Sequence, residues 1–148
     1  MRTGWQTAVL SGRADGPMNN EQEWLFDTGC LIDIYLGRER IRPYFDSILT
    51  EEMTPRLSVI TEAELWRGLR TGELEKHQAL VARFVILPLR SAAARLAGSW
   101  MQRYQVAGLG WMDALITATA KVNNIAILTR DKKLAQLLAG EADFTLYA

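Results

Sequence analysis

The sequence predicts a three-layer α/β domain with a mainly parallel central sheet. Two observations carry this prediction: short apolar runs recur along the chain, and stretches with helical spacing separate them. Apolar runs without polar alternation are typical of strands covered on both faces. The runs are WLF at 24–26, LSVI at 57–60, FVIL at 84–87, IAIL at 125–128 and FTLY at 144–147.

Helices are expected between these strands. Leu31, Ile34 and Tyr35 share one helical face and are followed by Gly37, a typical C-terminal stop. Ser91 is a candidate N-cap, and the GLG sequence that ends at Gly110 separates two helices. The other helical stretches are 42–53, 61–69, 73–84, 91–108 and 111–124.

The chain is expected to form one folded domain preceded by an extension. It has 148 residues, of which 49% are hydrophobic and 23% charged, and this suits one domain with a sizeable core. Residues 1–22 mix Gly, Asn, Asp and Pro without an apolar period, so we expect a poorly ordered extension or leader, with Met18 as a possible natural start, and a domain over 23–148. No apolar run approaches the roughly 20 residues needed to span a bilayer, and a cytoplasmic protein that binds no membrane is expected.

Composition excludes several chemistries. The single cysteine, Cys30, cannot form an internal disulfide. With only one histidine, His77, a thiol/imidazole zinc site and a histidine-pair nuclease are both excluded. The formal net charge is +0, with 17 basic and 17 acidic side chains. If four acids occupied one metal site, the remaining surface would be mildly basic, which permits phosphate binding.

Acidic residues cluster where the predicted strands end. Asp27 closes WLF and Asp131 follows IAILTR, whereas Glu62 and Glu64 fall in the first helical turn after LSVIT. Asp113 opens the helix that runs back before the IAIL strand. In parallel sheets, sites form beyond the carboxyl ends of the strands, so these acids are expected at one edge.

Four carboxylates in one cleft would repel one another unless a positive group lay among them. Oxygen ligands without imidazole or thiolate select hard cations, so Mg²⁺ or Mn²⁺ is the predicted cofactor. Such ions activate water and orient phosphodiesters. The pattern therefore indicates phosphodiester hydrolysis.

Each acid also has a purely structural interpretation. Asp27 suits a turn after a strand, and Asp113 suits a helix N-terminus, where it complements the dipole. Thr61 and Glu64 fit a capping box equally well. Asp131, between two basic residues, suits a solvated ion pair.

Three other acids are not in the predicted set of metal ligands. Glu62 is the alternative to Glu64. Asp33 and Asp46 fall on predicted helices and are expected on solvated faces.

Four segments, taken in order, resemble the acidic motifs of PIN-domain ribonucleases, especially VapC-type toxins. They are LFDTGCLIDIYLG, LSVITEAELWRGL, WMDALITATA and ILTRD, and the likeness runs from about Trp24 to the end. The resemblance implies a PIN-like α/β/α fold in which four acids bind the metal and catalyse: Asp27, Glu64, Asp113 and Asp131. It also implies that Thr28 and Thr129 support them. Gly29 departs from the family, which usually has asparagine there.

The resemblance further implies a metal-dependent endoribonuclease that acts as the toxin of a type II toxin–antitoxin pair. RNA would be its substrate. Such toxins usually form homodimers, and a small VapB-like antitoxin silences them by laying its C-terminal segment across the active-site groove.

Basic residues near the acidic motifs are candidates for binding RNA. Arg67 and Arg130 are expected to contact phosphate or an antitoxin acid. The next nearest in sequence are Arg70, Lys132 and Arg38. Trp66 and Trp111 suit core packing, with base stacking or a dimer interface as the alternatives.

Two other function classes are compatible with acids at strand ends. A receiver-like regulatory module would need an aspartate after its third strand, but PLRSAAAR follows there and holds no acid. A catalytically inactive PIN-fold binding module is the other, and Gly29 is the feature that keeps it open.

Overall fold

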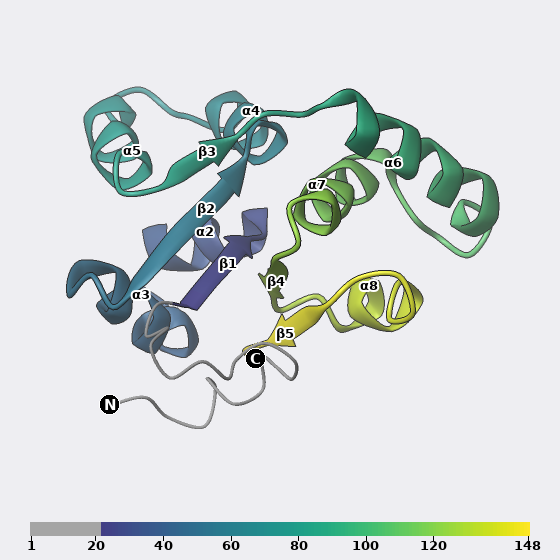
Figure 1. Ribbon diagram of the computed structural model, residues 1–148. Coiled ribbons are helices and arrows are strands. Elements are labelled where there is room, and N and C mark those ends of the chain that lie inside the picture. Colours follow the sequence, from purple (N-terminus) through teal and green to yellow (C-terminus); the bar gives the residue numbers. More distant parts are fainter. Residues whose placement is uncertain (1–21) are drawn as a thin grey trace.

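The described residues, 22–148 of the computed structural model, form an α/β domain around one parallel sheet (Figure 1). The strands are β1 (Gln22–Phe26), β2 (Met53–Ser58), β3 (Val85–Leu87), β4 (Ala126–Thr129) and β5 (Phe144–Leu146). Their order is β3-β2-β1-β4-β5, and every neighbouring pair is parallel. The predicted fold class is confirmed. Apart from Gln22, the extension expected over 1–22, including Met18, lies outside the described residues.

Helices connect the strands, as the alternating pattern predicted. They are α2 (Thr28–Tyr35), the 3₁₀ turn η1 (Glu39–Ile41), α3 (Arg42–Leu49), α4 (Val59–Arg67), α5 (Leu74–Val81), α6 (Ser91–Tyr104), α7 (Trp111–Val122) and α8 (Lys132–Leu137). Gly37 follows α2 with φ 68°, the left-handed conformation that glycine adopts at helix ends.

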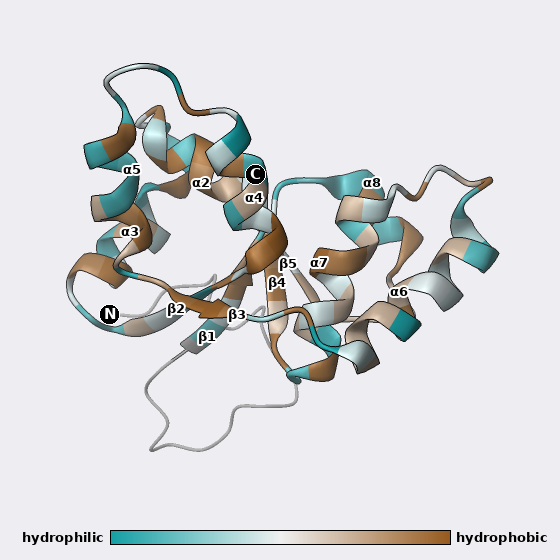
Figure 2. Ribbon diagram, turned by 90° about the horizontal axis from the view of Figure 1, so that it is seen from above, coloured by the Kyte–Doolittle hydropathy of each residue, from teal (hydrophilic) through white to brown (hydrophobic). Residues whose placement is uncertain are grey.

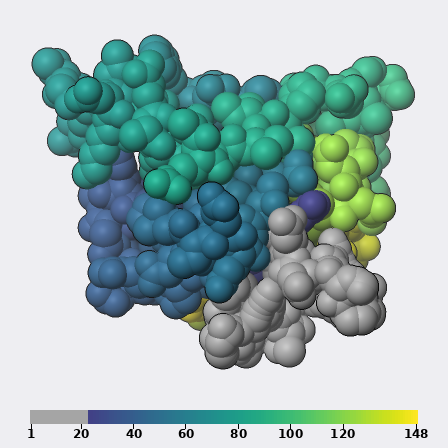
Figure 3. All heavy atoms as spheres, turned by 60° about the vertical axis from the view of Figure 1, so that its left-hand side comes forward, coloured from purple at the N-terminus to yellow at the C-terminus, as the bar shows by residue number. Residues whose placement is uncertain are grey.

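The core lies on both faces of the sheet, which explains the strands' lack of polar alternation. Trp24 and Phe26 of β1 pack with Tyr44 of α3 on one face. Leu25, between them in sequence, packs with Ile116 of α7 on the other. Figure 2 shows β3 and β4 mainly in brown, the hydrophobic end of its colour scale. Beside β2 and β3, segments from α3 to α5 form one continuous surface, blue to teal in Figure 3.

The second strand differs from its prediction. The LSVI run suggested a strand over 57–60, but β2 ends at Ser58, and Val59 and Ile60 begin α4. The Ser58 side chain accepts a hydrogen bond from the Ile60 N–H at 2.9 Å. This N-cap starts the helix within an apolar run, where apolar periodicity alone cannot separate strand from helix.

The expected cap of α6 is also wrong. Arg90 occupies the N-cap position without a side-chain cap bond, and Ser91 is the first helical residue. The Ser91 hydroxyl instead accepts from the Arg95 guanidinium at 2.8 Å. The short helix α8 was not predicted at all, because its six residues are too few for a clear helical period.

Candidate functional site

Asp27 connects β1 to α2 at the carboxyl end of the sheet. Its backbone N–H extends the sheet by donating to the Leu128 carbonyl at 3.0 Å. Its side chain is the N-cap of α2, where Oδ1 accepts from the Thr28 N–H at 2.9 Å. Its other oxygen, Oδ2, accepts from the Thr129 hydroxyl at 2.7 Å. The structural interpretation of Asp27 as a turn and cap residue is therefore compatible with a second role at the sheet edge.

Thr129 links two of the acids. It ends β4 and is fully buried, donates to Asp27, and accepts from the Asp131 N–H at 3.0 Å. Asp131 is the N-cap of α8 through a bond from the Leu134 N–H at 3.0 Å. The ion pair expected for Asp131 is absent from residues 22–148, since the cap bond holds the side chain instead.

Glu64 lies on α4 and faces the start of α2. The Thr28 hydroxyl donates to Glu64 Oε1 at 2.6 Å, and the Thr61 hydroxyl is 3.0 Å from that of Thr28. Because the Thr28 proton is used by Glu64, Thr61 donates to Thr28. The capping-box interpretation of Thr61 and Glu64 is wrong, because Ser58 caps α4 and Glu64 bonds across to another helix.

Asp113 occupies the first turn of α7, whose N-cap is Gly110. It joins the other three acids around one cavity of about 400 Å³. The lining residues are Asp27, Thr28, Gly29, Ile32, Glu64, Asp113, Arg130 and Asp131. The fold thus brings together the four acids that the motifs singled out, and Glu62, the alternative to Glu64, is not among the lining residues.

Burial and nearby negative charge raise the pKa of two of these acids, Asp113 and Asp27. Burial first, and then the charges of Asp27, Asp131 and Glu64, raise the pKa of Asp113 to about 6. Burial also raises the pKa of Asp27, although the Thr129 and Thr28 hydrogen bonds oppose the shift. The causes of both shifts are burial and like charge, so the cavity gathers negative charge that a cation would compensate.

The donor set fits a hard divalent cation, because every side chain that faces the cavity with a polar acceptor carries oxygen. The carboxylates are not drawn together into a coordination shell, however. Within the part of the chain that the structure describes, no three His, Cys, Asp or Glu side chains are arranged to hold an ion. Glu64, Asp27 and Asp131 each accept a hydrogen bond from a neighbour instead, which keeps these mutually repelling groups apart.

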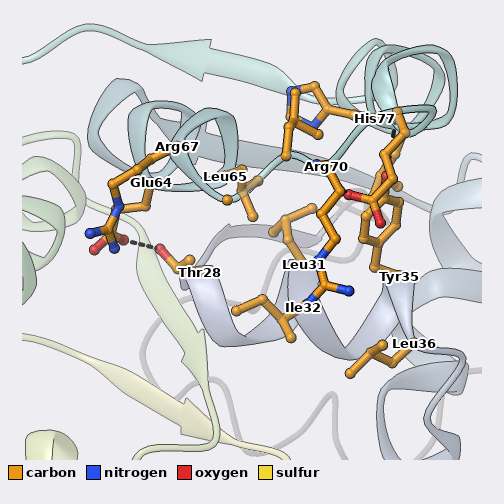
Figure 4. Close-up of a pocket in the computed structure, with 14 residues that line it drawn as sticks. Thr28, Leu31, Ile32, Tyr35, Leu36, Glu64, Leu65, Arg67, Arg70 and His77 are labelled. Carbon is orange, nitrogen blue, oxygen red and sulfur yellow. Dashed lines mark hydrogen bonds between the residues drawn. The ribbon is translucent and has the colours of Figure 1, made fainter.

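A second, larger cavity adjoins the first. Its volume is about 580 Å³, and it lies between α2, α4 and the region of α5 (Figure 4). Thr28, Ile32 and Glu64 line both cavities. Apolar side chains form much of the groove, including Leu31 and Leu65, and Figure 4 shows side chains of α2 and α4 pointing toward one another.

Three of the five predicted basic residues line one of the two cavities, and Arg38 and Lys132 line neither. Arg67 and Arg70 line the larger groove, and Arg130 lines the acidic one. Trp66 and Trp111 are 55% and 50% exposed, so the expectation that they pack in the core is wrong.

One acid was misplaced by sequence reasoning. Asp46 is exposed as predicted, but Asp33 is only 1% exposed and pairs with Arg40 and Arg130. The signal was present in the sequence, because Asp33 stands between apolar residues in LIDIYL on a helix that packs on the sheet.

The parallel sheet and the carboxylate-lined cavity at its edge define a class of α/β domain, and comparison with known families identifies it. The family model of the PIN domain matches residues 24–138, and the chain belongs to this family. None of the helices in residues 22–148 is long and apolar enough to cross a membrane.

Individual relatives match parts of the chain. Ribonuclease VapC10 of Mycobacterium tuberculosis is 40% identical over 77 residues, which are 49% of this chain and 56% of that protein. The chain thus spans little more than half the length of this relative.

Solved structures match more of the chain. FitAcB from Neisseria gonorrhoeae is 27% identical with a TM-score of 0.65, covering 81% of this chain and 94% of that one. VapBC2 from Rickettsia felis, bound to a promoter DNA fragment, has a TM-score of 0.72 over 86% of this chain and 100% of that one. Its identity of 18% supports the fold alone.

Proposed function

We propose that this PIN domain is a metal-dependent endoribonuclease and the toxin of a type II toxin–antitoxin pair. The observation that carries the proposal is the convergence of four carboxylates on one cavity at the carboxyl edge of the sheet. The 40% identity to a ribonuclease of the VapC type supports the substrate class. The family assignment leaves a catalytically inactive PIN domain as the alternative to a nuclease.

Mg²⁺ or Mn²⁺ would be held by Asp27, Glu64, Asp113 and Asp131. When bound, the ion supplies charge that polarises the scissile phosphate and lowers the pKa of an attacking water. Those four residues are the proposed catalytic set.

The chain's own hydroxyl groups orient this set. Thr129 fixes one oxygen of Asp27, and the α2 backbone fixes the other, so this carboxylate has little rotational freedom. Thr28 holds Glu64 by a short hydrogen bond. Preorganised acids lose less conformational freedom when a ligand binds, which is the supporting role we assign to Thr28 and Thr129.

The groove beside the acids is the proposed binding site for the C-terminal segment of a small VapB-like antitoxin. Its apolar lining residues suit an amphipathic segment, and Arg67, which also lines it, suits an acidic side chain of that partner or an RNA phosphate. Because the groove shares Thr28 and Glu64 with the acidic cavity, an occupant would restrict access of RNA. The resemblance to VapC-type toxins also leads us to expect a homodimer and a cytoplasmic location.

RNA cleavage by the purified chain tests the proposal. Total cellular RNA should be cut in Mg²⁺ or Mn²⁺ and remain intact in EDTA, and Mn²⁺ added in excess of the chelator should restore cleavage. Brief expression in a bacterial host should arrest growth. RNA that stays intact under every metal condition would identify the inactive PIN alternative, and cleavage undiminished in EDTA would remove the metal from the proposal.

A further inference from the structure

Beside the acidic cavity, a buried carboxylate contacts two arginines and one tyrosine from three parts of the chain. Asp33 on α2 is 1% exposed, and its Oδ2 accepts from the Tyr147 hydroxyl at 2.7 Å and from Arg40 Nε at 3.2 Å. The Nε of Arg130 lies 3.5 Å from the same oxygen. Asp33 Oδ1 is buried and has no hydrogen-bond partner among residues 22–148. Asp33 therefore pairs with the Arg130 guanidinium group through its Nε atom.

Gly29 provides the space in which that guanidinium lies. A Cβ at position 29 would stand 2.9 Å from Arg130 Nε and 3.2 Å from Nη2. Real Cβ atoms essentially never approach a heavy atom to less than 3.0 Å, so any side chain here would push the guanidinium away. The hydrogen at Gly29 allows Arg130, which follows β4, to lie against the first turn of α2.

Arg130 is also part of the wall of the acidic cavity. The side chain is 35% exposed and lines the cavity together with the four acids. Within the described part of the chain, no hydrogen bond engages its terminal nitrogens. An arginine that is anchored at Nε and open at its terminal nitrogens is a preoriented donor for a tetrahedral oxyanion.

We propose that Arg130 binds a non-bridging oxygen of an RNA phosphate in the acidic cavity, and that Gly29 and Asp33 are its positioning residues. The inference deepens the proposed nuclease function and rests on it for the identity of the substrate. A phosphate is favoured over a partner's carboxylate because Arg130 lines the same cavity as the four acids, where the reacting phosphodiester must lie.

Two matched pairs of variants test this assignment by RNA binding. Gly29→Ala inserts the Cβ that displaces Arg130, whereas Gly98→Ala inserts one in α6 where nothing lies within 4 Å. Both replace a helical glycine by alanine and keep every charge. Arg130→Gln removes the proposed contact, whereas Arg83→Gln removes an equal charge just before β3, at the opposite end of the strands.

Binding is measured by fluorescence anisotropy with a labelled single-stranded RNA of mixed sequence, in Ca²⁺ and over a range of salt concentrations. Arg130→Gln should weaken binding about tenfold or more, as expected for a lost hydrogen bond to a charged group. It should also lower the slope of log K against log salt concentration by about 0.7, the value for one phosphate contact on a single strand. Gly29→Ala should weaken binding several-fold, and the two control variants should bind like the wild type.

A smaller loss in Arg130→Lys, which keeps the charge without the planar fork, would support the oriented contact. The Tm of Gly29→Ala should equal or exceed that of the wild type, because only a flexible side chain must move. Equal binding by Gly29→Ala and Gly98→Ala, or an unchanged salt slope in Arg130→Gln, would overturn the proposal. Wild-type protein that binds no RNA would overturn it too, as would variants that lose only antitoxin binding.

The RNA-binding test of Arg130 and the RNA-cleavage test of the proposed nuclease function can give different answers. If the wild type binds RNA but does not cleave it, the nuclease proposal fails while the binding series still decides the role of Arg130. If it cleaves RNA, KM should rise in Arg130→Gln, and an unchanged KM with unchanged binding would remove Arg130 and leave the nuclease proposal standing.

Discussion

At two places in this molecule the surroundings shift the pKa of a carboxylate in opposite directions. In the cavity at the carboxyl edge of the sheet, burial and three like-charged neighbours raise the pKa of Asp113 to about 6. Between α6 and the segment before β5, Glu141 accepts bonds from the Tyr104 hydroxyl at 2.7 Å, Trp100 Nε1 at 3.2 Å and Arg103 at 3.1 Å. The Tyr104 bond, followed by those of Trp100 and Arg103, lowers the pKa of Glu141.

Glu141 therefore stabilises the folded state, whereas the acids of the cavity destabilise it. Glu141 has a donor for each of its oxygens and joins α6 to the C-terminal part of the chain. The cavity acids face one another, which is unfavourable for folding unless something positive binds there. Such unfavourable clusters concentrate at functional sites, where ligand binding supplies the missing partner.

The largest expected effect is on the rate of RNA cleavage, compared between a variant that neutralises a cavity acid and one that neutralises Glu141. Asp27→Asn should abolish cleavage and host-growth arrest, because a neutral amide is a poor ligand for a hard cation. Glu141→Gln should leave the cleavage rate unchanged, because Glu141 does not line the cavity. The rates are measured with the same RNA and the same Mn²⁺ concentration. Toxicity of Asp27→Asn equal to that of the wild type would remove Asp27 from the catalytic set.

The fold was predictable because its signal is carried by runs of similar residues. The buried WLF and IAIL runs mark strands whatever their exact ends, and both proved to be central strands. The boundary between β2 and α4 was not predictable, because Val59 and Ile60 continue an apolar run and only the Ser58 cap turns them into a helix.

The site was predictable only as far as topology determines it. Asp27 and Asp131 follow adjacent parallel strands, so their proximity is a consequence of strand order. The contact between Gly29 and Arg130 depends on side-chain paths between residues 101 positions apart, and no period in the sequence encodes it. Glu64 could be separated from Glu62 only by the direction of the α4 helix.

Metal binding should change thermal stability through the cavity acids alone. Mn²⁺ at about a hundred times its Kd should raise the Tm of the wild type by about 5 to 10 °C, from mass action and the size of the domain. Glu141→Gln should show the same increase, and Asp113→Asn a much smaller one. The measurement is differential scanning calorimetry with and without the ion. An equal Tm increase in Asp113→Asn would show that the ion binds elsewhere.

A smaller effect is expected at Glu141 without metal. Glu141→Gln should lower the Tm by a few degrees at neutral pH, because three donors lose a charged acceptor. A lowered folded-state pKa means that the stabilising contribution is present above the ordinary value of 4.5 and is lost as the pH falls through the folded-state pKa. The Tm difference between Glu141→Gln and wild type should therefore shrink in acid. A difference that stays constant with pH would assign the loss to packing.

The smallest effect, of opposite sign, is expected at Asp113 in metal-free protein. Its folded-state pKa is raised from 3.8 to about 6, so its favourable contribution is complete below pH 3.8 and is lost as the pH rises through 6. Asp113→Asn cannot ionise and should have a Tm equal to that of the wild type near pH 4 but higher by a few degrees above pH 6, in EDTA. Asp46→Asn, an exposed acid outside the cavity, is the matched control and should show no such pH dependence. If Asp113→Asn lowered the Tm above pH 6, the repulsion inferred among the four carboxylates would be absent, and with it the reason for a cation to bind there.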